Sequence, residues 1–183
     1  MKKVTIVLAL NLFYLLSFSQ DFLGVKVGGG RQETVNKFIS KGFKVSITPS
    51  KTVTSMKGMV GNTEFEVLIV CTPTTKKVWK YIIYLPKETT WYSLKASYNT
   101  YLSVLTDKYG EPNTVYNTFV SPYYEGDGYE MSAVVLEKCN FYAFWDGVYM
   151  QISEYKQVSI TYENDIMAQL NKDEYNAINS AIY

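Results

Sequence analysis

The feature that most constrains the fold is an order of predicted elements that occurs twice along the chain. In each half a helical pattern ends at a glycine, Gly42 or Gly110, and several short runs rich in β-branched and aromatic residues follow it. A glycine just past the end of a helix favours a turn there, and the following runs have the composition of strands. The sequence therefore predicts an α+β fold in which two tandem helix-plus-antiparallel-strand repeats form a sheet with helices on one face.

The first repeat is expected over about residues 32–85. Its helix has Val35, Phe38 and Ile39 at helical spacing, and Gly61-Asn62 is a two-residue hairpin signal between two of its strands. The predicted helix spans 32–41, and the predicted strands span 43–48, 52–60, 63–71 and 78–85.

The second repeat is expected over about residues 93–163. Asp146-Gly147 is the strongest short hairpin signal in the chain. The predicted helix spans 93–109, and the predicted strands span 113–120, 140–145, 148–153 and 158–162.

Two further segments lie outside the repeated order. Within 121–138, Asp127 and Glu130 have the spacing of a capping box, which predicts a short helix over 128–138, although the apolar run 133–136 would also suit a strand. Residues 165–183 form a helical tail, with a helix expected from about Asp173.

The first nineteen residues have the pattern of a secretory signal peptide. Two lysines precede an apolar stretch at 4–16, and Ser17 and Ser19 are small residues at the two positions read by a signal peptidase. The stretch is shorter than the roughly 20 residues that span a bilayer. We expect cleavage after Ser19, a single α+β domain over 20–183 without a membrane span, and a periplasmic or secreted protein. With no cysteine near the cut, a lipidated N-terminus is not expected.

Composition excludes several classes of function. The chain has no histidine, which removes the commonest general base and the commonest metal ligand. Its 18 basic and 17 acidic residues argue against an electrostatic nucleic-acid binder. We therefore expect no cofactor, no metal and no nucleic-acid partner.

Two cysteines, Cys71 and Cys139, are compatible with a disulfide in an oxidising compartment. A buried free thiol would fit Cys71 equally well, because it ends an apolar run.

The motifs that could carry chemistry are weak. The glycine-rich segment 24–30 lacks both a preceding strand and a following Gly-Lys-Ser/Thr, so it does not predict a phosphate loop. Glu125, Asp127 and Glu130 crowd one loop, but only Glu125 and Asp127 keep the alternate spacing of a calcium loop. The serines near lysines form no Ser-x-x-Lys motif. We predict no catalytic residue and no enzyme.

Aromatic residues in the predicted strands are the candidate binding residues. Alternation places Trp79, Tyr81 and Ile83 on one face of their strand and Tyr84 on the other. Aromatic residues in strands fill a sheet–helix core or form a partly exposed binding face, and both interpretations stay open. The weak binding candidates are Trp79, Tyr81, Tyr84, Tyr142, Tyr149 and Tyr155.

Four segments carry a resemblance that spans nearly the whole mature chain. They are Phe22-Leu23-Gly24-Val25, Ser40-Lys41-Gly42-Phe43, Lys108-Tyr109-Gly110-Glu111-Pro112 and Val158-Ser159-Ile160-Thr161-Tyr162-Glu163. In these the chain resembles a family of uncharacterised exported bacterial proteins. Its predicted architecture is also similar to the tandem-repeat fold of the β-lactamase inhibitor protein and of small outer-membrane assembly lipoproteins. That resemblance implies a protein-binding sheet face.

The sequence thus favours an exported, non-enzymatic binding module that uses its open sheet face for an unknown protein or cell-envelope ligand. The alternatives are a carboxylate-dependent enzyme acting on glycans and a structural envelope component.

Overall fold

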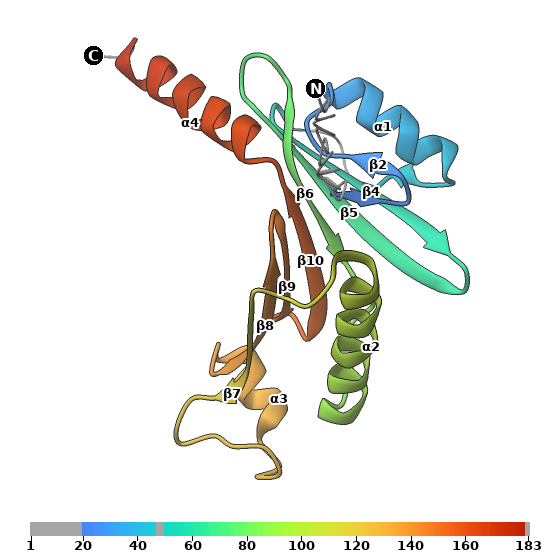
Figure 1. Ribbon diagram of the computed structural model, residues 1–183, viewed down its shortest axis with the longest axis vertical. Coiled ribbons are helices and arrows are strands. Elements are labelled where there is room, and N and C mark those ends of the chain that lie inside the picture. The colour runs from blue at the N-terminus through green and yellow to red at the C-terminus, as the bar shows by residue number, and fades with distance from the viewer. Residues whose placement is uncertain (1–19, 47–49, 182–183) are drawn as a thin grey trace, which may run out of the picture.

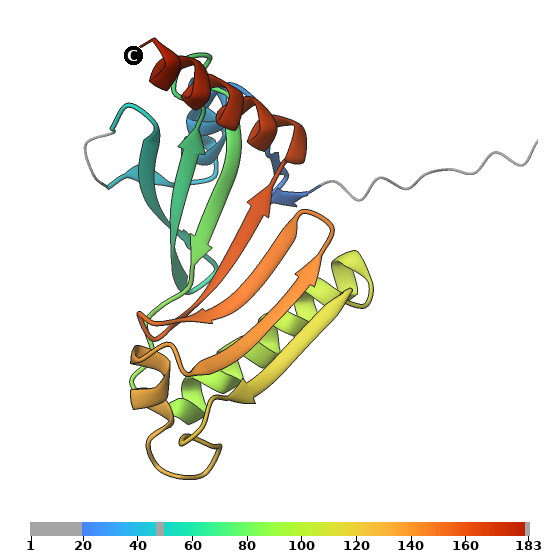
Figure 2. The same ribbon diagram turned by 90° about the vertical axis from the view of Figure 1, so that its left-hand side faces the viewer.

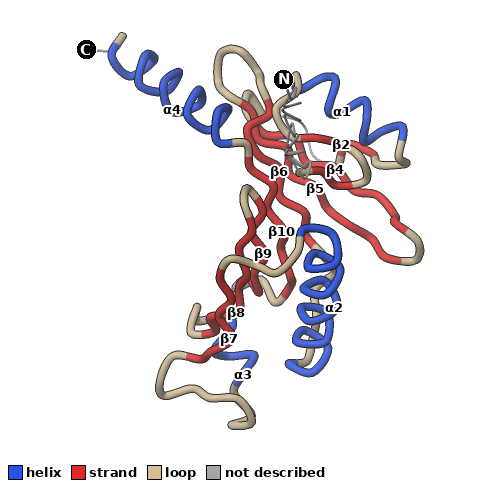
Figure 3. The backbone as a smooth tube through the Cα atoms, viewed as in Figure 1, coloured by secondary structure: helices blue, strands red, loops and turns tan. Residues whose placement is uncertain are grey.

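A computed structural model describes residues 20–46 and 50–181, and the predicted signal peptide at 1–19 lies outside them. Within these residues, four helices pack against an eight-stranded antiparallel open sheet (Figures 1 and 3). The first half contributes β1 (Asp21–Phe22), β2 (Val25–Lys26), α1 (Arg31–Ser40), β3 (Lys44–Val45), β4 (Val53–Val60), β5 (Thr63–Cys71) and β6 (Val78–Tyr84). The second half contributes α2 (Trp91–Tyr109), β7 (Thr114–Phe119), α3 (Glu130–Val135), β8 (Cys139–Trp145), β9 (Val148–Ser153), β10 (Gln157–Glu163) and α4 (Asp165–Ser180).

The strand order joins two meanders at the centre of the sheet. The order is β3-β4-β5-β6-β10-β9-β8-β7, so the last strand of each half pairs with the last strand of the other. The β6–β10 register runs from Ser159 opposite Tyr84 to Glu163 opposite Lys80. The expected hairpins at Gly61 and Gly147 are present, and both glycines have a positive φ that a two-residue hairpin turn requires.

Helices α1 and α2 lie on one face of this sheet, and the opposite face is open apart from α4 at one end (Figures 1 and 2). Alternate residues of the strands point toward α1 and α2 and form the core. The buried set includes Phe65, Val67 and Ile69 of β5, Tyr81 and Ile83 of β6, Phe141 and Ala143 of β8, Val148 and Met150 of β9, and Ile160 and Tyr162 of β10.

Tyr81 links several parts of this core. Its ring lies 5.1 Å from that of Tyr162 and 5.8 Å from that of Phe38. Its hydroxyl donates to the Val25 carbonyl at 2.7 Å and accepts from the Phe22 N–H at 2.8 Å. Tyr81 therefore attaches the β1–β2 hairpin to the middle of the large sheet.

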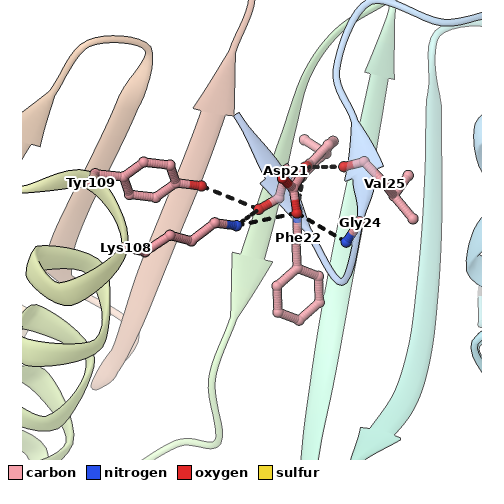
Figure 4. Close-up of polar contacts among 7 residues, drawn as sticks. Asp21, Phe22, Gly24, Val25, Lys108 and Tyr109 are labelled. Atoms are coloured by element: carbon pink, nitrogen blue, oxygen red, sulfur yellow. Dashed lines mark hydrogen bonds and ion pairs between the residues drawn. The ribbon is translucent and has the colours of Figure 1, made fainter. Parts of the chain in front are cut away.

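The β1–β2 hairpin also contacts the second half of the chain (Figure 4). Lys108 Nζ donates to the Asp21 carbonyl at 2.7 Å and lies 3.1 Å from its carboxylate, and the Tyr109 hydroxyl donates to the same carbonyl at 3.2 Å. The Asp21 carboxylate also accepts from the Gly24 N–H, which closes the turn. Sequence patterning predicted only an irregular glycine-rich segment here, because strands of two residues show no alternation.

The two segments outside the repeated order differ from expectation. Helix α3 begins at Glu130, and the expected capping box does not form. Instead Asp127 accepts from the Tyr124 and Tyr129 N–H groups, and Glu130 accepts from the Gly126 N–H, so both carboxylates hold the preceding loop.

Helix α4 begins eight residues before the expected Asp173. The Asn164 side chain caps it by accepting from the Met167 N–H, and the Asn164 N–H donates to the Trp79 carbonyl. Further along, the Glu174 carboxylate accepts from the N–H groups of Thr74 and Thr75 and from the Thr75 hydroxyl. These polar contacts hold a helix that has no fully buried residue.

The disulfide that the sequence left open is not formed. Cys71 and Cys139 are free thiols on β5 and β8, and β6, β10 and β9 lie between those strands. Four strand spacings of about 4.8 Å separate the two residues by roughly 19 Å across the sheet alone, and the strand registers place them near opposite ends of the sheet, whereas a disulfide needs Cα atoms within about 7 Å.

The two hydrogen bonds of the Tyr81 hydroxyl predict unequal costs for two similar substitutions. Tyr81 and Tyr98 are both fully buried, but the Tyr98 hydroxyl has no hydrogen-bond partner among the described residues. Tyr81→Phe should lower the free energy of unfolding by about 1–3 kcal/mol, because it removes the hydrogen-bond partner of the Val25 carbonyl and of the Phe22 N–H. Tyr98→Phe should change the free energy of unfolding very little, because it removes no hydrogen bond. Denaturant unfolding measures both, and equal losses would contradict this account.

The buried tyrosines also predict alkaline destabilisation. Burial raises the pKa of Tyr81, Tyr98 and Tyr162 well above the ordinary 10.0. Above that pH the unfolded chain releases these protons while the folded chain keeps them, so the free energy of unfolding falls as pH rises. Denaturant titrations above pH 10.0 should show the free energy of unfolding falling as pH rises, and these tyrosines should cause no such fall below that pH. A free energy of unfolding that stays constant above pH 10.0 would be inconsistent with three buried hydroxyls.

Candidate functional site: the open face of the sheet

The open face carries mainly polar side chains on β4, β5, β6 and β10 and mainly aromatic ones on β7, β8 and β9. Strand alternation and register assign its residues. Its members include Lys57, Glu64, Glu66, Lys80, Ile82 and Tyr84 from β4 to β6, Ser159, Thr161 and Glu163 from β10, and Tyr149, Gln151, Tyr142, Phe144 and Tyr116 from β9 to β7.

Four neighbouring rings on three strands form what we name the aromatic cluster: Tyr116, Tyr142, Phe144 and Tyr149. Tyr116 of β7 is directly opposite Tyr142 of β8, with ring centroids 4.8 Å apart. Phe144 of β8 is directly opposite Tyr149 of β9, and these rings stack at 4.5 Å with an interplanar angle of 25°. Tyr142 joins the two pairs, 5.6 Å from Phe144 and 6.3 Å from Tyr149.

The aromatic cluster is accessible at its outer members and ordered at its inner ones. Tyr116 is 48% exposed and Phe144 is 41% exposed, whereas Tyr142 and Tyr149 are half-buried. The Tyr149 hydroxyl donates to the Gln151 side-chain oxygen, and burial raises the pKa of Tyr149 to about 12. Tyr149 therefore keeps its proton near neutral pH and can donate a hydrogen bond. The stack on Phe144 and the hydrogen bond to Gln151 fix the position of its ring.

A cavity of about 530 Å³ adjoins the aromatic cluster. Phe144 and Tyr149 form one wall, and Ile82 of β6 lies across β10 from them. The polar lining consists of Lys80, Gln151, Thr161, Glu163 and Asp165. Asp165 is the first residue of α4, so the start of that helix forms part of the rim. A concave site with apolar rings and a few polar groups is the usual form of a ligand site.

The structure separates the six aromatic candidates of the sequence into different environments. Tyr142 and Tyr149 belong to the aromatic cluster, and Tyr84 is on the same face, in a smaller cavity of about 190 Å³. Tyr155 is 57% exposed in the turn before β10. Tyr81 is buried on the opposite face, in the core.

Trp79 departs from the expected alternation. The β5–β6 register shifts so that Cys71 is opposite Val78 and Val70 is opposite Lys80, which leaves Trp79 without a partner. Lys80 Nζ lies 4.3 Å from the centre of the Trp79 ring, and the buried Trp79 Nε1 has no hydrogen-bond partner among the described residues.

Sequence reasoning missed Tyr116 and Phe144 as site residues. Phe144 lies in a predicted strand beside Tyr142, but apolar phenylalanine is the expected core residue. Tyr116 shares one strand face with Thr114 and Thr118, a pattern that indicates an exposed face but not which strand lies beside it.

The acidic loop has a structural role. Glu125 pairs with Lys95 and accepts from Trp91 Nε1, and the hydrogen bond from Lys95 lowers the pKa of Glu125. In the part of the chain that the structure describes, no cluster of three or more acidic or cysteine residues could hold a metal ion.

No family model, curated protein or solved structure matches this chain. Among residues 20–46 and 50–181, no helix is long and apolar enough to cross a membrane.

The Phe144–Tyr149 stack predicts a measurable coupling. In a double-mutant cycle of Phe144→Leu and Tyr149→Leu, the free energies of unfolding should be non-additive by about 0.5–1.5 kcal/mol, because stacked rings contribute beyond their buried area. The matched cycle of Phe144→Leu and Tyr84→Leu should be additive, since β9 and β10 separate these residues. Equal coupling in both cycles would refute the stack.

Proposed function

We propose that this protein is an exported, non-enzymatic binding module that holds a protein or cell-envelope ligand on the open face of its sheet. The observation that supports this most is the aromatic cluster beside a cavity of about 530 Å³. Tyrosine rings give large contact areas at low conformational cost, and their hydroxyls supply hydrogen bonds.

The layout of the site supports a ligand with both apolar and polar groups. Phe144 presents an exposed ring at the border between the aromatic cluster and the cavity. Beyond it, Lys80 offers a cation, and Glu163 and Asp165 offer carboxylates. A ligand seated there would bury its apolar part on the rings and pair its polar part with these three side chains.

The expectation of export rests on the sequence pattern at residues 1–19. A periplasmic or secreted binding module would meet envelope components directly. Each half consists of one helix followed by a four-strand meander, and the last strands of the two halves, β6 and β10, pair with each other. This layout supports an origin by duplication. We infer that the two halves are tandem repeats, and that the chain is similar to exported bacterial proteins and to the β-lactamase inhibitor fold.

Removing the exposed rings should weaken binding without unfolding the protein. We expect the double variant Tyr116→Ser, Phe144→Ser to lose at least about tenfold in affinity for a ligand captured from envelope fractions or found on a glycan array. The matched control is Tyr92→Ser, Tyr129→Ser, which removes two exposed rings outside the open face. Titration of each purified ligand against wild type and both variants gives the affinities, and circular dichroism checks folding.

Unchanged affinity in the cluster variant, or an equal loss in the control, would rule out the aromatic cluster as the binding site. The second candidate, a carboxylate-dependent enzyme acting on glycans, is favoured by one observation: Glu163 and Asp165 line the same cavity. Glycan cleavage that is lost in Glu163→Gln while glycan binding persists would establish that alternative.

A further inference from the structure

The two edges of the eight-stranded sheet are built differently. The edge strand β3 has two residues and carries Lys44, and both a short strand and a lysine protect an edge from pairing with other chains. The other edge strand, β7, has six residues in unbroken register with β8. Residues 113–120 contain neither a charged residue nor a proline. β7 thus lacks the protection that β3 has.

The backbone of β7 has hydrogen-bonding groups free for a further strand. The Val120 N–H donates to the Lys138 carbonyl at 2.8 Å, in register with the pairs from Thr114–Phe144 to Phe119–Cys139. Since antiparallel ladders alternate, even-numbered residues of β7 bond to β8 and Val115, Asn117 and Phe119 point their N–H and C=O groups outward. Among the described residues, these three make no backbone hydrogen bond outside the β7–β8 ladder.

The side chains of β7 are also accessible on both faces. Residues 114–118 are all exposed, including Val115, which points to the helix-covered side and is still 40% exposed. α2 therefore leaves this edge uncovered, and an added strand would bury apolar surface of Val115 and Tyr116.

Charge indicates which strand fits. β7, β8 and β9 together contain nineteen residues and no charge, whereas β3, β4, β5, β6 and β10 each carry at least one. In a two-fold symmetric pair each residue of the edge faces a residue of the identical edge, so an edge with charges of one sign would repel its own copy. The uncharged edge is compatible with itself, and it offers no charge to select a different partner.

We propose that β7 pairs antiparallel with β7 of a second copy of this chain about a two-fold axis, which continues the sheet across both copies. With the axis at Tyr116, Thr114 lies opposite Thr118 of the second copy and the two Tyr116 rings meet on the open face. Thr–Thr and aromatic pairs of this kind stabilise neighbouring strands. The two aromatic clusters then form one continuous surface.

A substitution at Asn117 tests the pairing directly. Asn117→Pro removes an outward N–H and leaves the β7–β8 bonds in place, whereas Asn117→Ala keeps that N–H. We expect the wild type and Asn117→Ala to sediment as a concentration-dependent dimer, and Asn117→Pro to dimerise at least about tenfold more weakly. Thermal unfolding of both variants checks that they fold.

Amide hydrogen exchange gives a second readout. Protection of Val115, Asn117 and Phe119 should rise with protein concentration, while that of Tyr116 and Thr118 should not. A wild type that stays monomeric at every concentration overturns the proposal, even if an extended peptide binds β7, and so does equal dimerisation of both variants. Asn117 points away from the open face, so a failed dimer test leaves ligand binding by the aromatic cluster to be judged separately.

Discussion

The pairing of β6 with β10 joins the two halves of the chain into one sheet, and the other long-range contacts depend on it. Along this seam Tyr81 and Tyr162 are directly opposite each other, with ring centroids 5.1 Å apart. The Tyr81 hydroxyl then reaches the β1–β2 hairpin, which in turn contacts the end of α2 through Asp21. One cross-strand pair thus connects the sheet, the N-terminal hairpin and a helix of the other half.

The same seam determines the shape of the candidate site. Because β10 lies between β6 and β9, Lys80 and Ile82 of the first half share one cavity with Tyr149 and Gln151 of the second. Each half alone would present an incomplete set of groups. The charged side chains of the open face then lie mainly on the first half, and the aromatic cluster lies on the second.

Local sequence signals predicted the elements well where a strand has clear ends. The strands at 63–71 and 148–153 have the predicted bounds, because hairpin residues or polar turns border them. Helix α4 was placed too late, although Asn164 is a favoured N-cap residue and Ile166 and Leu170 have helical spacing. Trp79 falls outside the predicted alternation because a bulge depends on the neighbouring strand, which a single strand does not reveal.

The candidate site was less predictable than the fold. Tyr142 and Tyr149 were identified from composition, but their grouping with Tyr116 and Phe144 depends on the register between strands. The same composition led to Tyr81, whose position in the register with Tyr162 places it in the core. The free cysteines follow the same principle, since strand order and register together set the distance between Cys71 and Cys139.

The attachment of α4 has a mechanical consequence for the cavity. Asp165, at the start of this helix, is part of the cavity rim. More than two turns later, the Glu174 carboxylate accepts hydrogen bonds from the N–H groups of Thr74 and Thr75 in the turn between β5 and β6. The helix is therefore held at both ends, by its Asn164 cap beside the cavity rim and by the Glu174 contacts on the opposite half of the chain. A change at Thr75 would free the far end of the helix whose start forms part of the rim, without touching any residue that lines the cavity.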